Sequence, residues 1–472
     1  MNILKEYRLI PIEEDEERIR LMVPPNFRDK DIEEIRFLTG KDVEVVIVDE
    51  EEFSRELQNR LSMEEVIIES EEEETVDVNR DILLEAEDSP VVNLVNSVLI
   101  KASTAEASDI HFEPYEDEAI VRLRMDGILH DYLKIPKNMY ESVVSRIKVM
   151  ANMNVAEKRV PQDGRIRIRI GVKDLDIRVS TVPTVMGERV VLRLLDRSGS
   201  LLELEDLGLE KEDIEKVKRL AKRPYGIVLV TGPTGAGKST TLYAMLLYVK
   251  GPEKNIITIE DPVEYQIKGI SQIQINPKVG LTFASGLRSI LRQDPDIIMV
   301  GEIRDSETAD IAVHAALTGH LVLSTLHTND APSAVTRLSD MGIEPFLIAS
   351  SLEGVIGQRL VRKICDSCKE PYRPTPTELA ELGLEEKSDL VFYRGRGCEE
   401  CLGTGYKGRT GIFEVLEFDE DLKSFIIKTQ DAVPIRRFAK KKGFSTMMED
   451  GIRKILKGIT TPHEVISVIR EV

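Results

Sequence analysis

The spacing of apolar residues changes along the chain, and each change marks a region with its own expected architecture. From about Asp213 onward, helical patterns alternate with short runs that are apolar at nearly every position, such as Gly226–Val230 and Asn255–Ile259. A strand that is covered by helices on both faces has this continuous apolar character. The alternation predicts a parallel α/β sheet, which we assign to residues 218–359.

Residues 110–196 have a different pattern, because apolar and polar side chains alternate there with a period of two. That period is typical of strands that bury one face and expose the other. Helical spacing before and within this stretch predicts helices at Pro90–Ala107 and near Tyr140–Met153. Residues 90–200 are therefore expected to form an α+β domain, with strands at Ala119–Met125, Arg165–Ile170, Asp174–Ser180 and Val190–Leu195.

The N-terminal residues predict a small α/β module, with helices at Asp29–Thr39 and Glu52–Leu61 and a strand at Val43–Val48. The run Glu71–Glu74 then introduces a stretch with little pattern, which predicts a linker. After about Leu360 the chain becomes rich in Cys, Gly and Pro, and it ends in a helical tail. The expected regions are 1–75, a linker at 76–89, 90–200, a linker at 201–217, 218–359, 360–410 and a helical region at 411–472.

Negative charge is concentrated at one end of the 472-residue chain. Residues 1–90 hold 29 acidic and 11 basic side chains, a net charge of −18 out of −20 for the whole chain. This excess favours a docking module for a basic protein partner, with a solvated and partly disordered acidic segment as the alternative. Nucleic-acid binders usually carry a basic surplus, so no nucleic acid is expected as a partner.

The sequence also bears on location. No apolar run approaches the roughly 20 residues that cross a bilayer. The first residues, MNILKEYRLIPIEEDEE, lack the pattern of a cleavable secretory signal. We therefore expect a cytosolic chain that is able to dock on a membrane complex.

A glycine-rich loop lies between the apolar run Gly226–Val230 and the helical stretch Leu242–Val249. It matches the pattern G-x-x-x-x-G-K-[ST] in the strand–loop–helix setting that this motif requires. Glycines let backbone N–H groups approach phosphate oxygens, and the helix N-terminus adds partial positive charge. We expect Lys238 to reach the β- and γ-phosphates of a nucleotide and the Ser239 hydroxyl to ligate Mg²⁺. The expected nucleotide-binding residues are Gly232, Pro233, Thr234, Gly235, Ala236, Gly237, Lys238, Ser239 and Thr240.

Carboxylates end two further apolar runs. Glu260, Asp261 and Glu264 follow Asn255–Ile259, and Glu302 ends the next such run. The carboxyl ends of parallel strands face the crevice in which α/β sheets bind ligands. One of the first three acids is expected to orient or deprotonate the attacking water, and Glu302 to bind Mg²⁺ directly or through water.

Two histidines flank the apolar run Leu321–Leu326. His320 precedes this run, and His327 lies at its C-terminal end. At that edge of the sheet His327 is a candidate sensor of the γ-phosphate. A purely structural histidine is the alternative.

All four cysteines fall into two C-x-x-C pairs, and glycines at 395, 397, 403 and 405 surround the second pair. Two such pairs with no spare cysteine are typical of a tetrahedral zinc site without an open position. Disulfide bonds are the alternative, and a reducing compartment disfavours them. The expected ligands of a structural Zn²⁺ are Cys365, Cys368, Cys398 and Cys401.

Together these motifs resemble those of the secretion ATPases of type II secretion and type IV pilus systems, over nearly the whole chain from about residue 90. GPTGAGKST is similar to the Walker A motif of this family, ITIEDPVEY to its Asp box, DPDIIMVGEIRD to its Walker B motif and TGHLVLSTLHTN to its His box. The resemblance implies a RecA-like ATPase core and a PAS-like second domain. The catalytic roles that it implies fall on Glu264, Glu302, Lys238 and His327.

The resemblance also implies roles for four arginines. Arg178 and Arg193 of the second domain would reach nucleotide phosphate when that domain closes on the motor, and Arg288 and Arg292 would lie near the site. An arginine delivered by closure would stabilise transition-state charge and couple motion to hydrolysis. A surface salt bridge is the alternative for each of the four.

The resemblance implies an ATP-hydrolysing hexameric motor that powers pseudopilus assembly and export through a type II secretion system. Its implied partners are further copies of the chain, a polytopic inner-membrane platform protein, and the cytoplasmic domain of a bitopic inner-membrane protein that binds residues 1–75. Some relatives bind a cyclic dinucleotide through glycine- and arginine-containing repeats in this region. Residues 1–75 contain a single glycine, Gly40, so we do not assign that activity.

Other functions are compatible with parts of the pattern. The cysteine pairs favour the secretion and pilus-assembly branches over the retraction branch, and a type IV pilus assembly ATPase is the main alternative. A DNA-translocating ring ATPase would need the basic, aromatic-studded tract that this chain lacks. A scaffold with an inactive site is disfavoured because Lys238, Ser239, Glu264 and Glu302 are all present.

Overall fold

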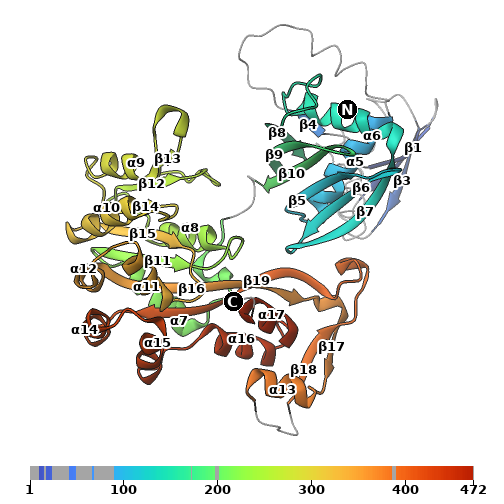
Figure 1. The fold of residues 1–472 in the computed structure, drawn as a ribbon. Coiled ribbons are helices and arrows are strands. Elements are labelled where there is room, and N and C mark those ends of the chain that lie inside the picture. The colour runs from blue at the N-terminus through green and yellow to red at the C-terminus, as the bar shows by residue number, and fades with distance from the viewer. Residues whose placement is uncertain are drawn as a thin grey trace. The chain divides into compact units, whose positions relative to one another are not determined.

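The computed structural model in Figure 1 divides the chain into two compact units, Met1–Gly199 and Ser200–Val472. Each unit has a buried apolar core of its own. Within the part of the chain that the structure describes, no helix combines the length and the apolar character that a membrane crossing needs. The described residues are 10–14, 18–23, 42–48, 66–68, 90–171, 173–196, 201–384 and 390–470.

A small mixed sheet forms the N-terminal part of the first unit. It contains β1 (Ile10–Glu14), β2 (Arg18–Val23) and β3 (Asp42–Ile47), with β2 antiparallel to β1 and parallel to β3. The strand expected at Val43–Val48 is therefore present. The helices expected at 29–39 and 52–61, and the linker expected at 76–89, lie outside the described residues.

The rest of the first unit is an antiparallel seven-stranded sheet in the order β4-β8-β9-β10-β5-β6-β7. Helices α5 (Pro90–Thr104) and α6 (Lys137–Met150) share one apolar core with this sheet, so they cover the same face of it. The strands are β4 (Val66–Ile68), β5 (Asp109–Pro114), β6 (Glu118–Met125), β7 (Ile128–Pro136), β8 (Gln162–Ile170), β9 (Lys173–Thr184) and β10 (Gly187–Asp196).

All four strands and both helices that the sequence predicts in this α+β region are present. Two of the strands, β5 and β7, were not expected, and burial explains why. Strand β5 is buried at five of its six positions, and β7 is largely exposed, so neither has the clear alternation that identified the other strands. The polar residues His111 and Glu113 are among the buried positions of β5.

The second unit is built on a seven-stranded sheet in the order β13-β12-β14-β15-β11-β16-β19 (Figure 1). Its strand pairs are parallel except for β16 with β19, which confirms the parallel α/β core. The strands are β11 (Gly226–Thr231), β12 (Ile256–Glu260), β13 (Ser271–Gln274), β14 (Ile297–Val300), β15 (Leu321–Leu326), β16 (Leu352–Ile364) and β19 (Tyr406–Glu417).

Both faces of this sheet are covered by helices, and β11 shows how its sequence allows that. Ile227 and Leu229 belong to a core shared with α9 to α12, α14 and α15, whereas Val228 and Val230 belong to a core shared with α7 and α8. The helices are α7 (Lys211–Ala221), α8 (Lys238–Val249), α9 (Phe283–Ile290), α10 (Ser306–Leu317), α11 (Ser333–Asp340), α12 (Pro345–Ser351), α14 (Glu420–Lys428) and α15 (Ala432–Lys441), with short 3₁₀ turns at Leu204–Leu207 and Pro277–Val279.

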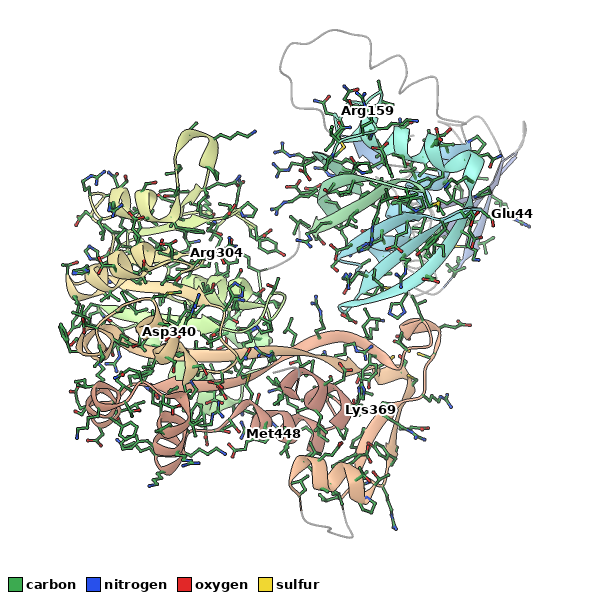
Figure 2. All side chains as sticks on the ribbon, viewed as in Figure 1. Glu44, Arg159, Arg304, Asp340, Lys369 and Met448 are labelled. Atoms are coloured by element: carbon green, nitrogen blue, oxygen red, sulfur yellow. The ribbon has the colours of Figure 1, made fainter. Side chains whose placement is uncertain are left out.

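The long antiparallel pair β16 and β19 carries the cysteine-rich segment between its two strands. The expected helical region at 411–472 therefore begins with a strand, because Phe413 and its neighbours complete the sheet opposite Gln358. Lys369 begins β17 of the cysteine-rich segment, and Met448 lies in α16 (Figure 2). The remaining elements are β17 (Lys369–Tyr372), α13 (Pro376–Leu382), β18 (Phe392–Gly395), α16 (Met447–Leu456), α17 (Pro462–Arg470) and 3₁₀ turns at Asp366–Cys368 and Glu399–Cys401.

Candidate nucleotide site

The glycine-rich loop turns directly from β11 into the first turn of α8. Gly232 and Gly237 adopt positive φ angles of 155° and 83°. A Cβ atom on Gly232 would lie 2.5 Å from the carbonyl oxygen of Gln358, and one on Gly237 would lie 2.9 Å from the Gln358 amide nitrogen. Only glycine fits both the backbone conformation and the close approach of β16, so the loop can keep its backbone N–H groups accessible.

Lys238 is the first residue of α8, and its side chain folds back over the loop. Its Nζ donates hydrogen bonds to the carbonyl oxygens of Gly232 at 2.8 Å and Pro233 at 2.9 Å. Burial, opposed by the nearby Glu302 carboxylate, lowers the pKa of Lys238 to about 8. An anionic phosphate at this position would favour the charged form of the amine.

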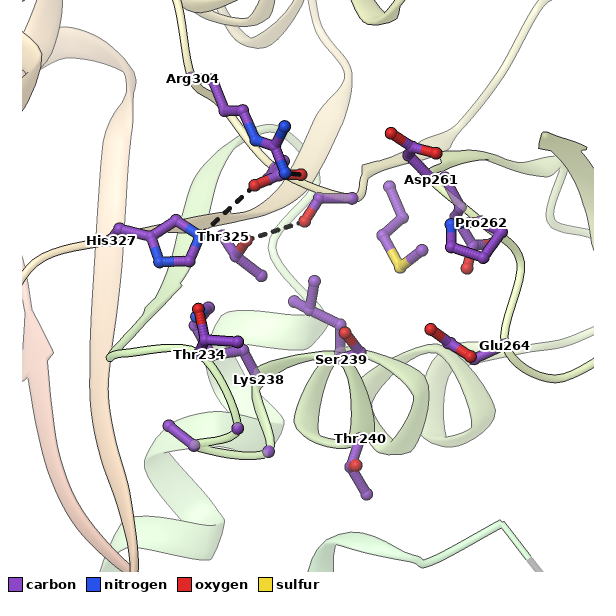
Figure 3. Close-up of a pocket in the computed structure, with 18 of the residues that line it drawn as sticks. Thr234, Lys238, Ser239, Thr240, Asp261, Pro262, Glu264, Arg304, Thr325 and His327 are labelled. Carbon is purple, nitrogen blue, oxygen red and sulfur yellow. Dashed lines mark hydrogen bonds and ion pairs between the residues drawn. The ribbon is translucent and has the colours of Figure 1, made fainter. Parts of the chain in front are cut away.

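A cavity of about 470 Å³ opens beside the loop, at the carboxyl ends of the strands. It brings together most of the residues that the sequence singled out. Thr234, Gly235, Ala236, Gly237, Lys238, Ser239 and Thr240 line it together with Glu264, Glu302 and His327. In Figure 3 Glu264 and His327 lie on opposite sides of Ser239, so the cavity is bounded by an acid on one side and a histidine on the other.

Glu302 follows β14 and has two cationic or polar neighbours in the cavity wall. Arg304 contacts one carboxylate oxygen at 2.5 Å, and His327 Nε2 lies 3.4 Å from the other (Figure 3). The hydrogen bond to Glu302 raises the pKa of Arg304, so this guanidinium remains charged. The Ser239 hydroxyl lines the same cavity, and a hydroxyl with a carboxylate is a donor set that Mg²⁺ accepts.

The three acids at the end of β12 and just beyond it occupy different environments. Glu260 is 4% exposed and accepts hydrogen bonds from Thr258 Oγ1 at 2.5 Å and Gln272 Nε2 at 3.1 Å. Asp261 is exposed, and Glu264 is half-buried in the cavity wall. Glu260 also lines the cavity, where Tyr243, Thr258 and Gln272 donate hydrogen bonds to its carboxylate.

The four arginines do not join this cavity. Arg288 lies 2.7 Å from Glu307, and Arg292 donates to the Arg288 carbonyl oxygen at 2.7 Å. Arg178 and Arg193 belong to the first unit, where they are cross-strand partners on β9 and β10. The Arg193 Nε donates to the Asp109 carboxylate at 3.1 Å.

Arg409 is a cavity residue that the sequence did not reveal. It lies on β19, far along the chain from the glycine-rich loop, and it reaches the cavity because β19 pairs with β16 so that Arg409 faces Arg362 across the strands. No motif spacing links Arg409 to the loop. The one local signal in the sequence is that two glycines, Gly408 and Gly411, lie on either side of Arg409.

The four cysteines converge at the end of the β16–β19 pair. The sulfur atoms of Cys365 and Cys398 are 3.7 Å apart, those of Cys368 and Cys401 are 3.9 Å apart, and those of Cys398 and Cys401 are 3.6 Å apart. A tetrahedral ion with bonds of about 2.3 Å places its sulfur ligands about 3.8 Å apart. Disulfide sulfurs lie about 2.05 Å apart, so the disulfide alternative does not describe this cluster, whose cysteines are all free.

Backbone geometry around the cysteines also fits a metal cradle. Although burial opposes it, the N–H groups of Cys398 at 3.1 Å and Gly405 at 3.2 Å donate to the Cys401 sulfur and lower the pKa of Cys401 to about 6. A Cβ atom on Gly395 would lie 2.0 Å from the Gly405 carbonyl oxygen. The two glycines therefore allow the chain on either side of the Cys398–Cys401 turn to come close together.

Comparison with known proteins identifies the family to which the chain belongs. Residues 84–467 match the family model of the type II/IV secretion system proteins, and residues 1–66 match the model of the MshEN domain. The chain belongs to the type II/IV secretion system protein family. This membership confirms the resemblance seen in the motifs, and with it the expected P-loop ATPase fold and the expected class of enzyme, an ATPase.

Individual family members and a solved structure are similar over most of the chain. The type II secretion system protein E of Pseudomonas aeruginosa is 53% identical over 80% of this chain and 75% of its own length. The type IV pilus assembly ATPase PilB of Thermus thermophilus is 52% identical over 79% of this chain and 42% of its own length. The crystal structure of the pilus retraction motor PilT with bound ADP is 27% identical, with a TM-score of 0.54, over 79% of this chain and 96% of that one.

We expect nucleotide binding to be coupled to proton uptake by Lys238. The amine has a pKa of about 8 without a ligand and must be charged to pair with phosphate, so binding should take up about one proton at about pH 9 and little at about pH 7. Affinity should accordingly weaken as the pH rises above about 8. Calorimetric titration with ADP in buffers of different ionisation enthalpy measures this uptake.

A matched pair of variants separates Lys238 from other groups. Lys238→Arg keeps a charge that does not titrate in this range, so proton uptake should disappear while the exposed Lys254→Ala variant behaves as the natural protein. Uptake that persists unchanged in Lys238→Arg would assign the proton to another residue.

Proposed function

We propose that this chain is the ATP-hydrolysing motor of a type II secretion system, which acts as a hexameric ring and powers pseudopilus assembly and protein export. The observation that carries the proposal is the cavity into which the glycine-rich loop, four acids and a histidine converge. Membership of the type II/IV secretion system protein family, and 53% identity to a type II secretion system protein E, support this use of the cavity. A type IV pilus assembly ATPase is the second candidate, because PilB is nearly as similar.

The residues of the cavity divide the chemistry of hydrolysis among them. The loop N–H groups and Lys238 would bind the β- and γ-phosphates. Ser239 and Glu302 would hold Mg²⁺, which would neutralise charge on the phosphates. Glu264 accepts the proton of the attacking water from the opposite side. His327, beside Glu302, contacts the γ-phosphate and responds to its loss.

The arginines complete the site when subunits assemble. Arg193 lies near Asp109 and Arg288 lies near Glu307. Arg292 donates to the Arg288 carbonyl oxygen, and Arg178 is the cross-strand partner of Arg193. We propose that they exchange these partners for phosphate oxygens during closure, which would couple hydrolysis to domain motion. Arg409, already at the cavity, joins this group.

The cysteine cluster is proposed to hold one structural Zn²⁺. Four sulfur ligands with tetrahedral spacing leave no open position for a substrate, so the ion would stabilise the end of the β16–β19 pair and take no part in hydrolysis. A small core joins residues of α13, α16, α17 and the two long strands, so an ion that stabilised these strands would also support the C-terminal helices.

The proposed cellular setting is the cytoplasmic face of the inner membrane. Further copies of the chain form the ring, and a polytopic platform protein receives the motion. The acidic residues 1–75 bind the cytoplasmic domain of a bitopic membrane protein, for which their negative charge provides electrostatic attraction.

The role of Glu264 is tested by Glu264→Gln. The amide cannot accept a proton, so turnover of the assembled protein should fall by roughly 10²- to 10⁴-fold while ATP binding is retained. Glu253→Gln makes the same change at an exposed acid outside the cavity and should leave turnover unchanged. Steady-state turnover close to that of the natural protein in Glu264→Gln would remove Glu264 as the base.

Elemental analysis tests the metal. Protein purified without chelators should contain about one zinc ion per chain, and Cys398→Ser should reduce both zinc content and the resistance of residues 360–410 to proteolysis. Most of the cavity is formed by other elements, with Leu360 and Arg409 as the contributions of β16 and β19, so nucleotide binding should change much less. Zinc-free protein with a protease-resistant cysteine segment would contradict the assignment.

Deletion of residues 1–75 tests the docking module. ATP hydrolysis by an assembled ring should be largely retained, because every cavity residue lies in the second unit, whereas recruitment to membranes that contain the bitopic partner should be lost. Salt should weaken recruitment of the full chain. A truncated chain that still co-sediments with these membranes and supports export would refute the docking role.

A further inference from the structure

The segment that follows β12 carries Glu264 into the cavity, and side chains from two other elements hold its backbone. Tyr243, on α8, accepts a hydrogen bond from the backbone N–H of Glu264 at 3.3 Å. Gln272, on β13, donates to the carbonyl oxygen of Tyr265 at 2.9 Å and accepts from the N–H of Ile267 at 2.7 Å. Three backbone groups within four residues are therefore tied to side chains outside the segment.

These two side chains meet at the buried carboxylate of Glu260. The Tyr243 hydroxyl donates to one of its oxygens, and Gln272 Nε2 donates to the other at 3.1 Å, together with Thr258 Oγ1 at 2.5 Å. A carboxylate that is 4% exposed needs such donors to offset the loss of water. Glu260 thus links Tyr243 and Gln272 into one hydrogen-bonded unit.

Tyr243 is suited to hold this position. It is 2% exposed, and burial followed by the hydrogen bond with Glu260 raises its pKa, so the hydroxyl stays protonated and donates to the carboxylate. The Tyr243 hydroxyl donates its proton to Glu260 and accepts a hydrogen bond from the Glu264 N–H, so it acts as both donor and acceptor. Its ring packs edge-to-face on the ring of Tyr265, with centroids 6.0 Å apart.

The position of Tyr243 along α8 connects this unit to the phosphate site. The same helix carries Lys238 and Ser239 in its first turn, and Tyr243 follows one to two turns later. A helix is stiff over this length, so the contact at Tyr243 fixes the backbone of Glu264 relative to the residues proposed to hold phosphate and Mg²⁺. Tyr243 itself is not one of the residues that line the cavity.

We propose that Tyr243, Glu260 and Gln272 are positioning residues. They hold the segment that bears Glu264 in a fixed position relative to helix α8, so that the Glu264 carboxylate faces the attacking water. This rests on the proposed role of Glu264 as the base. Misplacement of a reacting group by about 1 Å costs on the order of a hundredfold in rate. A contact that controls such placement acts on turnover without touching the nucleotide.

Tyr243→Phe tests the proposal in the full-length assembled protein. The variant keeps the ring packing on Tyr265 and removes only the hydroxyl. We expect kcat to fall by roughly tenfold, with KM and nucleotide Kd unchanged, because the phosphate-binding loop is untouched. Gln272→Ala, which releases the segment from the β13 side, should give the same pattern.

Tyr248→Phe is the matched control. Tyr248 lies five residues further along the same helix, where its ring sits 4.7 Å from the Lys222 amine, away from the cavity. Removing its hydroxyl should leave kcat and KM unchanged. If kcat fell equally in Tyr243→Phe and Tyr248→Phe, the fall would be a general effect on the helix, and this would overturn the proposal.

The double variant Tyr243→Phe with Glu264→Gln identifies the path of the effect. If Tyr243 acts through Glu264, the double variant should turn over no more slowly than Glu264→Gln alone. The positioning role would be overturned if the reductions in kcat of the two single variants multiplied in the double variant. It would also be overturned by a rise in Kd equal to the fall in kcat, or by unchanged turnover in both Tyr243→Phe and Gln272→Ala. Natural turnover in Glu264→Gln would instead refute the base itself, so the two failures are distinguished.

Discussion

The close approach of the glycine-rich loop to strand β16 is the constraint on which the nucleotide site depends. Gly232 and Gly237 leave no room for a side chain against Gln358, and the Gln358 amide oxygen in turn accepts a hydrogen bond from Thr241 at 2.6 Å. The loop is thus held between the end of β11, the first turn of α8 and β16. His327, which follows β15, and Leu360, on β16, are positioned relative to this loop, because both strands pair in register with β11.

Helix α8 extends that constraint to Glu264. Its first turn carries Lys238 and Ser239, and Tyr243 contacts the backbone of Glu264. On the other side, β14 and β15 run parallel in register, which places Glu302 beside His327 after the strands end. Side-chain hydrogen bonds therefore fix the side of the cavity that contains Glu264, and strand pairing fixes the side that contains Glu302 and His327.

The long pair β16 and β19 joins the motor sheet to the cysteine cluster. It brings Arg409 to the cavity and carries Arg359, whose guanidinium donates to the Asn329 carbonyl oxygen at 3.0 Å, two residues after His327. Arg359 Nε also lies 3.4 Å from the Val468 carbonyl oxygen of α17. Arg359 therefore joins the loop that follows His327 to helix α17.

Local sequence determined the parts of this protein that depend on neighbours along the chain. The glycine-rich loop, the acids that end apolar strands and the two cysteine pairs follow from spacing, because each motif is a single turn between predictable elements. Strands β5 and β7 could not be predicted in this way, since β5 is buried at five of its six positions and β7 is mostly exposed. The tertiary structure alone decided that Glu260 is engaged by Tyr243 and Gln272 while Glu264 faces the cavity, and that Arg409 reaches it. These outcomes depend on the packing of α8, β13 and β19, and the pairing of segments so distant in sequence leaves no local pattern to read.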